Sequence, residues 1–283
     1  MEKRRLGKTG EMLSIVGFGG IVVMDVTPEE ASQYVTAAVE ERGVNYFDVA
    51  PTYGNAEERL GPALAPYRDD VFLACKTGKR TAEEAEAELH QSLEKLRTDH
   101  FDLYQLHAVK TDEDVETILG PSGALETFVK ARDQGLVRYL GFSAHSEEAA
   151  LALIDAFDFD TILFPINWVC WLKAGFGPSV VEAASAKDMG ILALKTLAKR
   201  RWKEGEQRRW SKTWYSPVDT FEEARDAFRF TFSRPVTAGP SPGHTQLFNW
   251  MCDAADQFVP LTTELELELA EKAEGLEPIF PQG

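Results

Sequence analysis

The chain has 283 residues, of which 44% are hydrophobic, and it carries a formal net charge of −16. The length suits one (β/α)8 barrel, for which roughly 250 residues is typical, and the charge argues against nucleic acid or an anionic membrane as a partner, because both would be repelled. The three cysteines are far apart and odd in number, so they indicate neither a disulfide framework nor a metal site.

The N-terminal quarter predicts a hairpin followed by strands and helices. The Gly-Lys-Thr-Gly turn at 7–10 lies between short extended runs, and a first buried strand follows it. Thr-Pro-Glu-Glu at 27–30 is a capping box with a first-turn proline, which predicts a helix that ends near Gly43. We expect a strand over 44–50 and a helix over 56–65 after it.

Strands and helices then alternate to the C-terminus. A strand over 71–78 precedes a second capping box at 81–84, whose helix should end near Arg97. The other expected strands cover 101–107, 137–143, 161–167, 191–198 and 236–239. The other expected helices cover 124–135, 146–157, 180–190, 221–233 and 244–258, with a surface helix within 261–278.

This alternation predicts an α/β fold with one parallel sheet and crossover helices, as in a (β/α)8 TIM barrel. Because no linker divides the chain, we expect a single domain over 1–283. A doubly wound fold is disfavoured, since the segment 17–25 does not supply the glycine-rich phosphate loop that such a fold places after its first strand.

Four chemically complementary side chains stand where predicted strands end. They are Asp48 and Tyr53 in VNYFDVAPTYG, Lys76 in VFLACKTG and His107 in FDLYQLHA. A lone polar residue after a strand is usually a loop group or a helix cap, but catalysis in a barrel of this kind is staged at the carboxyl ends of the strands. We therefore expect these four groups to surround one reacting atom.

The chemistry of the four groups suits protonation of an oxygen. A nearby Lys76 ammonium should lower the pKa of the Tyr53 phenol, with Asp48 holding the ammonium charged. His107 could donate a hydrogen bond to a carbonyl oxygen and direct that oxygen at Tyr53. Because the set contains no hydride source, it implies a nicotinamide cofactor.

The contexts FDVAPTYG, ACKTG and LYQLHA together resemble the catalytic tetrad of the aldo-keto reductases. GFGG at 17–20, GFSAH at 141–145, PIN at 165–167 and LKTLAK at 194–199 extend the resemblance in order over nearly the whole chain. The resemblance implies a barrel whose bottom is capped by the N-terminal β-hairpin. It also implies an NAD(P)H-dependent aldehyde or ketone oxidoreductase, with Tyr53 as the general acid and base.

The resemblance also implies residues that hold NADP, with NAD possible. Ser143 and Asn167 would bind the nicotinamide carboxamide, and Leu194 stands where the family often has an aromatic ring beneath the nicotinamide. The full predicted set for the cofactor is Gly19, Asp48, Ser143, Asn167, Leu194, Lys195, Leu197, Gly239, Ser241, Gly243, Thr245 and Asn249. The alternative for Ser143 is a helix cap, and for Asn167 a turn.

The chain departs from the family pattern at 239–249, where relatives often carry basic residues for the 2′-phosphate of NADP. Here Gly239 and Thr245 are uncharged, and Phe248 replaces an acid. Eight of the 30 basic residues instead gather at 195–212: Lys195, Lys199, Arg200, Arg201, Lys203, Arg208, Arg209 and Lys212. We hypothesise that Arg200 or Arg201 binds the 2′-phosphate, against the alternative that the cluster is a solvated surface.

Five of the six tryptophans lie in the segments after the sixth and seventh strands of the predicted barrel. Loops of this kind wall the mouth of a barrel and suit a substrate with an apolar part. Trp168 and Trp171 are the expected pocket residues.

Two other functions compete with the reductase. One is a cofactor-binding regulatory or interaction subunit that retains the barrel, although binding alone needs neither Tyr53 nor Lys76. The other is an aldolase in which Lys76 forms a Schiff base, and this requires a neutral amine. The N-terminus has no apolar signal stretch and no run is long enough to span a bilayer, so we expect a cytoplasmic protein that acts on a small carbonyl or alcohol.

Overall fold

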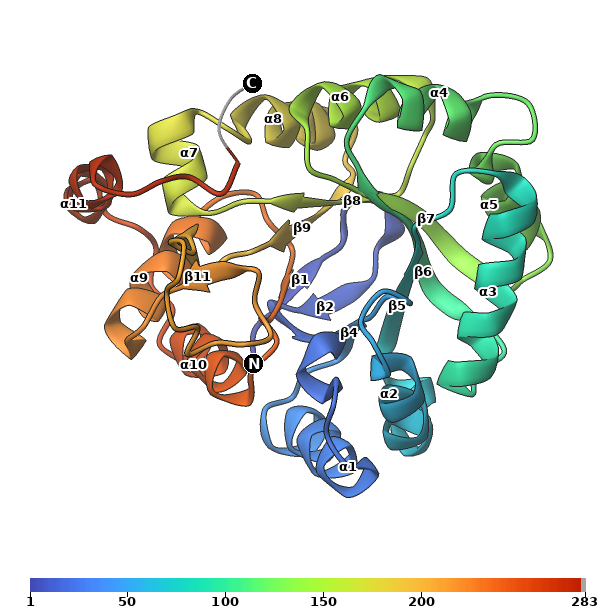
Figure 1. Cartoon of the computed structure of the whole chain (residues 1–283), viewed down its shortest axis with the longest axis horizontal. Helices are drawn as coiled ribbons and strands as arrows, with labels where there is room; N and C mark the ends of the chain where they lie inside the picture. The colour runs from blue at the N-terminus through green and yellow to red at the C-terminus, as the bar shows by residue number, and fades with distance from the viewer. Residues whose placement is uncertain (281–283) are drawn as a thin grey trace.

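The computed structural model describes residues 1–280, and eight parallel strands form a barrel at its centre (Figure 1). In chain order the barrel strands are β3 (Val16–Gly19), β4 (Tyr46–Asp48), β5 (Phe72–Thr77), β6 (Phe101–Val109), β7 (Val137–Ala144), β8 (Thr161–Pro165), β9 (Gly190–Leu194) and β12 (Gly239–Pro240). From β3 to β9 each strand pairs with the next, and β12 pairs with β3. A parallel bridge between Leu192 and Ala238 joins the remaining edge, so the predicted (β/α)8 barrel is confirmed.

Helices surround the barrel (Figure 1). They are α1 (Pro28–Thr36), α2 (Ala56–Leu64), α3 (Ala82–Leu96), α4 (Asp112–Leu119), α5 (Ala124–Asp133), α6 (Glu147–Ala156), α7 (Trp168–Ala174), α8 (Pro178–Ala186), α9 (Phe221–Phe232), α10 (Thr245–Asp256) and α11 (Thr263–Glu274). Short 3-10 turns cover Gly7–Thr9, Gly20–Val23 and Ala65–Asp70, and a π turn over Ala37–Glu41 extends α1. Among the described residues, no helix is both long and apolar enough to cross a membrane.

The expected N-terminal hairpin is confirmed as β1 (Lys3–Arg5) paired with β2 (Met12–Ser14). Its turn begins at Gly7, which has a φ of +48° that favours glycine. Leu6 and Leu13 of the hairpin are fully buried in the same apolar cluster as barrel residues Tyr46 and Leu103. The hairpin therefore contributes its own apolar side chains to the barrel interior.

Two capping-box predictions had opposite outcomes. Thr27 forms the complete box, because its hydroxyl accepts from the Glu30 N–H and the Glu30 carboxylate accepts from the Thr27 N–H. The box predicted at Thr81 is wrong, since the Thr81 hydroxyl instead donates to the Glu84 carboxylate at 2.8 Å. The backbone of Thr81 pairs with Gly123 in an isolated bridge, so this residue joins two segments instead of capping α3 by its side chain.

The structure contains elements that were not predicted from the sequence. Helix α4 begins with its own capping box at Thr111 and Asp114, and α7 begins at Asn167, whose side chain accepts from the Cys170 N–H. After β9, the chain forms a small antiparallel pair of β10 (Ala198–Arg201) with β11 (Tyr215–Pro217). The loop between β10 and β11 lies over the barrel mouth, beside the segment that follows α11 (Figure 1).

Candidate active site

The four predicted catalytic residues come together at the carboxyl ends of three neighbouring strands. Asp48 is the last residue of β4, Lys76 lies near the end of β5, and His107 lies near the end of β6. Tyr53 is in the turn that joins β4 to α2. This placement follows from the parallel pairing of β4, β5 and β6, which aligns their carboxyl ends at one edge of the sheet.

Lys76 and Asp48 form a buried ion pair, with exposed fractions of 1% and 2%. The Lys76 ammonium also donates to the Val49 carbonyl at 3.2 Å. The second Asp48 oxygen accepts from the Tyr46 hydroxyl and from Gln105 Nε2, both at 3.2 Å. Burial is the largest influence on the pKa of Lys76 and lowers it, but the charge and hydrogen bond of Asp48 together with the nearby Tyr53 outweigh burial, so this pKa lies above its ordinary value. The amine is therefore protonated at neutral pH.

The Tyr53 ring lies beside this ion pair and beside His107. Its centre is 5.7 Å from Lys76 Nζ and 6.1 Å from the centre of the His107 ring, with the two rings at 83°. Burial raises the pKa of Tyr53 and Lys76 lowers it, and the net pKa is above the ordinary value. Lys76 thus has the expected effect, but burial is stronger, so the phenol carries its proton at neutral pH.

His107 is held as a neutral imidazole. Burial lowers its pKa to about 3, and the charges of Lys76 and Lys195 act in the same direction. Its backbone carbonyl accepts from Arg80 Nη2 at 2.9 Å, and the β6–β7 ladder is irregular just after Leu106. A neutral ring has one N–H, so His107 can donate a single hydrogen bond without contributing charge.

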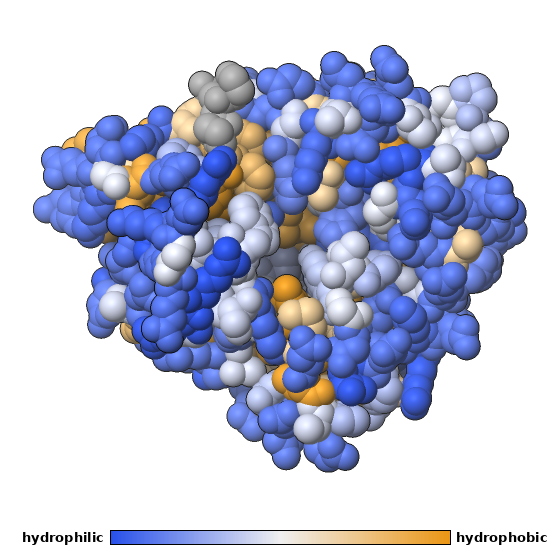
Figure 2. All heavy atoms as spheres, viewed as in Figure 1, coloured by the Kyte–Doolittle hydropathy of each residue, from blue (hydrophilic) through white to orange (hydrophobic). Residues whose placement is uncertain are grey.

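A cavity of about 130 Å³ lies against Asp48 and Tyr53. The face of the molecule in Figure 2 is hollowed near its centre, with hydrophobic atoms at the edge of the hollow. Five of the residues predicted to bind the cofactor line the cavity together with Asp48: Gly19, Leu194, Lys195, Ser241 and Gly243. Because ligand pockets typically measure ~300–1,000 Å³, this cavity has room for one end of a dinucleotide and not for all of it.

Gly19 and Ser241 hold two walls of this cavity together. The Gly19 N–H donates to Ser241 Oγ at 3.1 Å. A Cβ atom at position 19 would lie 2.2 Å from the Ser241 carbonyl oxygen, so only glycine fits there. Next to this wall α10 begins at Thr245, and no side chain caps its first N–H groups. Free N–H groups at a helix start suit an anion such as a phosphate.

The other predicted cofactor residues do not line the cavity. Ser143 and Asn167 are buried, and Ser143 Oγ accepts from the Ala108 N–H at 2.7 Å, while Asn167 caps α7. Helix α6 is capped by Ser146 and not by Ser143. Four more lie outside the cavity lining: Leu197 is buried, Gly239 lies in β12, Thr245 is the first residue of α10, and Asn249 is exposed on α10. Their roles toward a cofactor remain predictions.

The aromatic wall of the mouth comes from tryptophans other than the two expected. Trp168 is buried in the main core, and Trp171 packs on the Arg234 guanidinium, 4.6 Å from its ring centre. Neither is among the described residues that line the cavity at Tyr53 or the larger cavity beside Trp214. Trp202 and Trp214 of the β10–β11 loop lie there instead.

Most of the basic cluster at 195–212 is already paired. Arg200 makes two hydrogen bonds to Glu206, at 2.6 and 2.8 Å, and Lys199 binds Glu223 at 2.5 Å. The Lys212 ammonium donates to the carbonyls of Val22 and Met24. Since both terminal nitrogens of the Arg200 guanidinium already donate to the Glu206 carboxylate, they are not free to bind a phosphate in this structure.

Lys195 and His145 form a second buried basic pair that the sequence did not reveal. Lys195 Nζ lies 3.1 Å from His145 Nε2, and burial lowers the pKa of Lys195 to about 7. Burial and Lys195 together lower the pKa of His145 to about 2, so its neutral ring accepts the hydrogen bond. Lys195 also has a φ of +62°, an unusual backbone conformation that is often found at functional sites.

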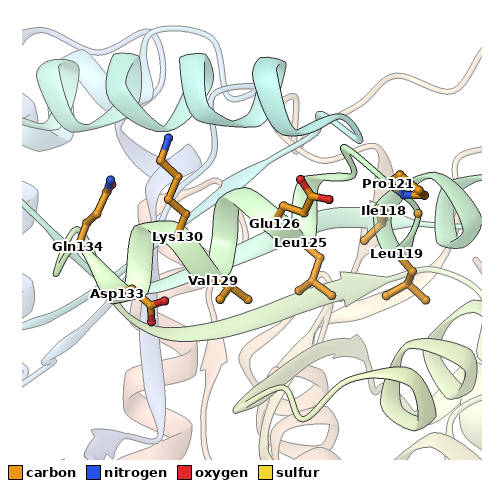
Figure 3. A pocket seen from close by; sticks show the side chains of 10 residues that line it. Ile118, Leu119, Pro121, Leu125, Glu126, Val129, Lys130, Asp133 and Gln134 are labelled. Carbon is orange, nitrogen blue, oxygen red and sulfur yellow. The ribbon is translucent and has the colours of Figure 1, made fainter.

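A larger cavity of about 760 Å³ lies on the outside of the barrel between α4 and α5. Figure 3 shows Leu119, Leu125 and Val129 pointing to the same side of these helices. None of the four catalytic candidates lines it, so it is not the site of the chemistry.

Comparison with known proteins agrees with this geometry. The model of the aldo/keto reductase family matches residues 16–271. The uncharacterized oxidoreductase YqkF of Bacillus subtilis is 31% identical over 158 residues, which is 51% of this chain and 49% of that protein. L-galactose dehydrogenase of Arabidopsis thaliana is 31% identical over 157 residues, 50% of this chain and 48% of that protein. The matched segment thus spans about half the length of these curated relatives.

The fold also matches a solved structure. The holo form of an aldo-keto reductase from Bacillus halodurans has a TM-score of 0.72 and 22% identity to this chain, and the match covers 99% of this chain and 98% of the other. At this identity the likeness concerns the fold alone.

Proposed function

Because the chain belongs to the aldo/keto reductase family, we propose that it is an oxidoreductase that interconverts carbonyl compounds and alcohols with a nicotinamide dinucleotide. The observation that carries the proposal is the buried Lys76–Asp48 ion pair, which lies beside the Tyr53 ring and beside neutral His107. An ion pair this deeply buried contributes little to stability on balance, so its presence beside a phenol favours a chemical role.

The residues around the cavity fit a dinucleotide. Leu194 offers an apolar surface for a ring, and the uncapped start of α10 beside Gly243 offers N–H groups for a phosphate. When bound, the cofactor supplies the reducing equivalent to the carbonyl carbon. We propose NADP as the cofactor, although the 239–249 segment carries no cation for its 2′-phosphate, so NAD is the alternative.

The residues of the chain provide the proton transfer. Tyr53 donates its proton to the carbonyl oxygen, since its raised pKa keeps it protonated until the reaction. The Lys76 ammonium stabilises the phenolate that results, and Asp48 keeps this ammonium charged. His107 donates one hydrogen bond that orients the carbonyl oxygen. The raised pKa of Lys76 also opposes a Schiff-base role for this lysine.

The test measures the oxidation of NADPH or NADH by a simple aromatic aldehyde in wild type and in Tyr53→Phe. The loss of the absorbance of the reduced cofactor gives the rate. The variant keeps the ring and loses the transferable proton, so turnover should fall at least roughly 10²-fold with cofactor affinity unchanged. A variant with near-normal turnover would exclude Tyr53 as the acid. Cofactor binding without turnover of any carbonyl in wild type would favour the regulatory subunit instead.

A further inference from the structure

A second cavity at the barrel mouth, of about 810 Å³, adjoins the catalytic one. Trp214 lines both cavities, so a single ligand can extend from Tyr53 past the Trp214 ring into the larger space. Lys110 and His145, which follow β6 and β7, form one side of it. Arg201, Trp202 and Arg208 from the β10–β11 loop form the other side.

The walls of this cavity are positively charged in a chain whose net charge is −16. Lys110, Arg201 and Arg208 line it, and no carboxylate is among its described lining residues. Arg201 lies 3.7 Å from Glu277 and is partly neutralised. Within residues 1–280, Lys110 and Arg208 make no ion pair. Such a local reversal of charge attracts anions.

Lys195 adds a buried charge at the boundary between the two cavities. Its Nζ lies 5.3 Å from the centre of the Trp214 ring and 5.4 Å from that of Phe280. Among the described residues its polar partner is His145, which is neutral, and no acid pairs with it. A buried ammonium without an anion is costly, so an anion that arrives here restores the missing partner.

The remaining walls are aromatic. Phe280 stacks on Phe176 with ring centres 5.3 Å apart, and it contacts the rings of His145 and Trp214. The C-terminal segment therefore closes one side of the cavity. Trp214 is 52% exposed, although tryptophan is ordinarily buried for most of its surface. Flat apolar walls beside cations suit a ligand with an aromatic or apolar frame and a negative group.

We propose that this cavity makes the enzyme selective for carbonyl compounds that carry a carboxylate or a similar anion on an aromatic or apolar frame. The carbonyl lies at Tyr53, the frame packs on Trp214, and the anion faces Lys195, Arg208 and Lys110. The proposal rests on the proposed reductase function. A cofactor phosphate is negatively charged, as is a substrate carboxylate, and either could bind these cations. The experiment therefore distinguishes the two ligands.

The first arm compares 4-carboxybenzaldehyde with 4-formylbenzamide, a neutral compound of nearly the same shape, by kcat/KM with the preferred cofactor. Wild type should favour the carboxylate roughly tenfold, as a charge-assisted hydrogen bond does. In the variant Lys110→Gln/Arg208→Gln the preference should fall toward one through a higher KM for the carboxylate. Arg209→Gln removes a charge from the same loop outside the cavity lining and should keep the preference.

The second arm measures binding without turnover, by quenching of tryptophan fluorescence with the same two compounds. Tighter binding of the carboxylate than of the amide in wild type, with a smaller difference in the double variant, would support the anion-binding role of the cavity. If no carbonyl is turned over, only the reductase proposal is contradicted, and the binding result still stands. Turnover of both aldehydes without preference would overturn the inference and leave the reductase standing. A double variant that weakens NADPH affinity and keeps the substrate preference would also overturn it, and would assign the cations to the cofactor phosphate.

Discussion

Two lysines at the mouth of one barrel are held in opposite electrostatic environments. Lys76 is buried against Asp48, and its pKa is raised. Lys195 is buried against neutral His145 and two aromatic rings, and its pKa is lowered to about 7. Both side chains are buried, with exposed fractions of 1% for Lys76 and 9% for Lys195, so the difference comes mainly from the partner. A balanced pair suits a permanent charge beside the chemistry, whereas an unbalanced charge suits an anion supplied by a ligand.

The largest expected effect comes from removing the charge of Lys76. Lys76→Met leaves the Asp48 carboxylate buried without a cation, so the free energy of unfolding should fall by about 3–5 kcal/mol. Turnover near neutral pH should fall as well, because the phenolate of Tyr53 loses its stabilising charge and the pKa of Tyr53 rises further. Urea unfolding and steady-state kinetics measure the two effects. Unchanged stability would show that Asp48 is satisfied by Tyr46 and Gln105 alone.

A smaller effect should appear in the pH dependence of carboxylate binding. Lys195 is protonated below its pKa of about 7 and neutral above it, so affinity for 4-carboxybenzaldehyde should decrease as the pH rises through this value. The neighbouring groups do not titrate there, since His145 and His107 stay neutral and Lys76 stays charged. Fluorescence titrations across this range measure the affinity. The neutral amide is the control, and an equal pH effect on its binding would refute the role of Lys195.

The smallest effect is expected for the stability of Lys195→Met. This change removes a buried charge that has no acidic partner among the described residues, so stability should stay within about 1 kcal/mol of wild type or increase. The same substitution at Lys76 is the matched comparison. A loss at Lys195 as large as that at Lys76 would mean that the two environments do not differ as described.

The sequence predicted the barrel and the convergence of the four candidate catalytic residues because both follow from local patterns. Apolar strand segments end at polar residues, and parallel pairing brings those ends together. Asp48, Lys76 and His107 lie in consecutive strands, so their convergence follows once consecutive strands are assumed to pair in parallel.

The sequence did not predict the Lys195–His145 pair or the rings around it. His145 is in the GFSAH motif, but its contact with Lys195 depends on the path of two loops and of the C-terminal segment that carries Phe280. Arg200 shows the same limit, since its binding to Glu206 depends on how the β10–β11 loop turns back on itself. Loop paths of this kind are set by tertiary packing and leave no periodic signal in the sequence.

Helix α7 was not predicted from the sequence, for a different reason. Trp168 and Trp171 were predicted at the mouth because their segment follows the sixth strand, and the seven residues of α7 are too few for a helical period to be visible. The capping signal of Asn167 was present, but it was interpreted as a cofactor contact. Both interpretations are compatible with that residue type, and only the hydrogen bond from the Cys170 N–H to Asn167 Oδ1 identifies the cap.

The most direct test of the account is the pH profile of carbonyl reduction with a neutral aldehyde under single-turnover conditions. The rate should be flat from about pH 6 to 9, because Tyr53 stays protonated, His107 stays neutral and no charge on Lys195 is needed for a neutral substrate. The rate should fall only at higher pH, as the phenol ionises, and Tyr53→Phe should lack this fall. An inflection near pH 6 to 7 that persists in Tyr53→Phe, about where an ordinary histidine titrates, would contradict the assignment of Tyr53 as the acid.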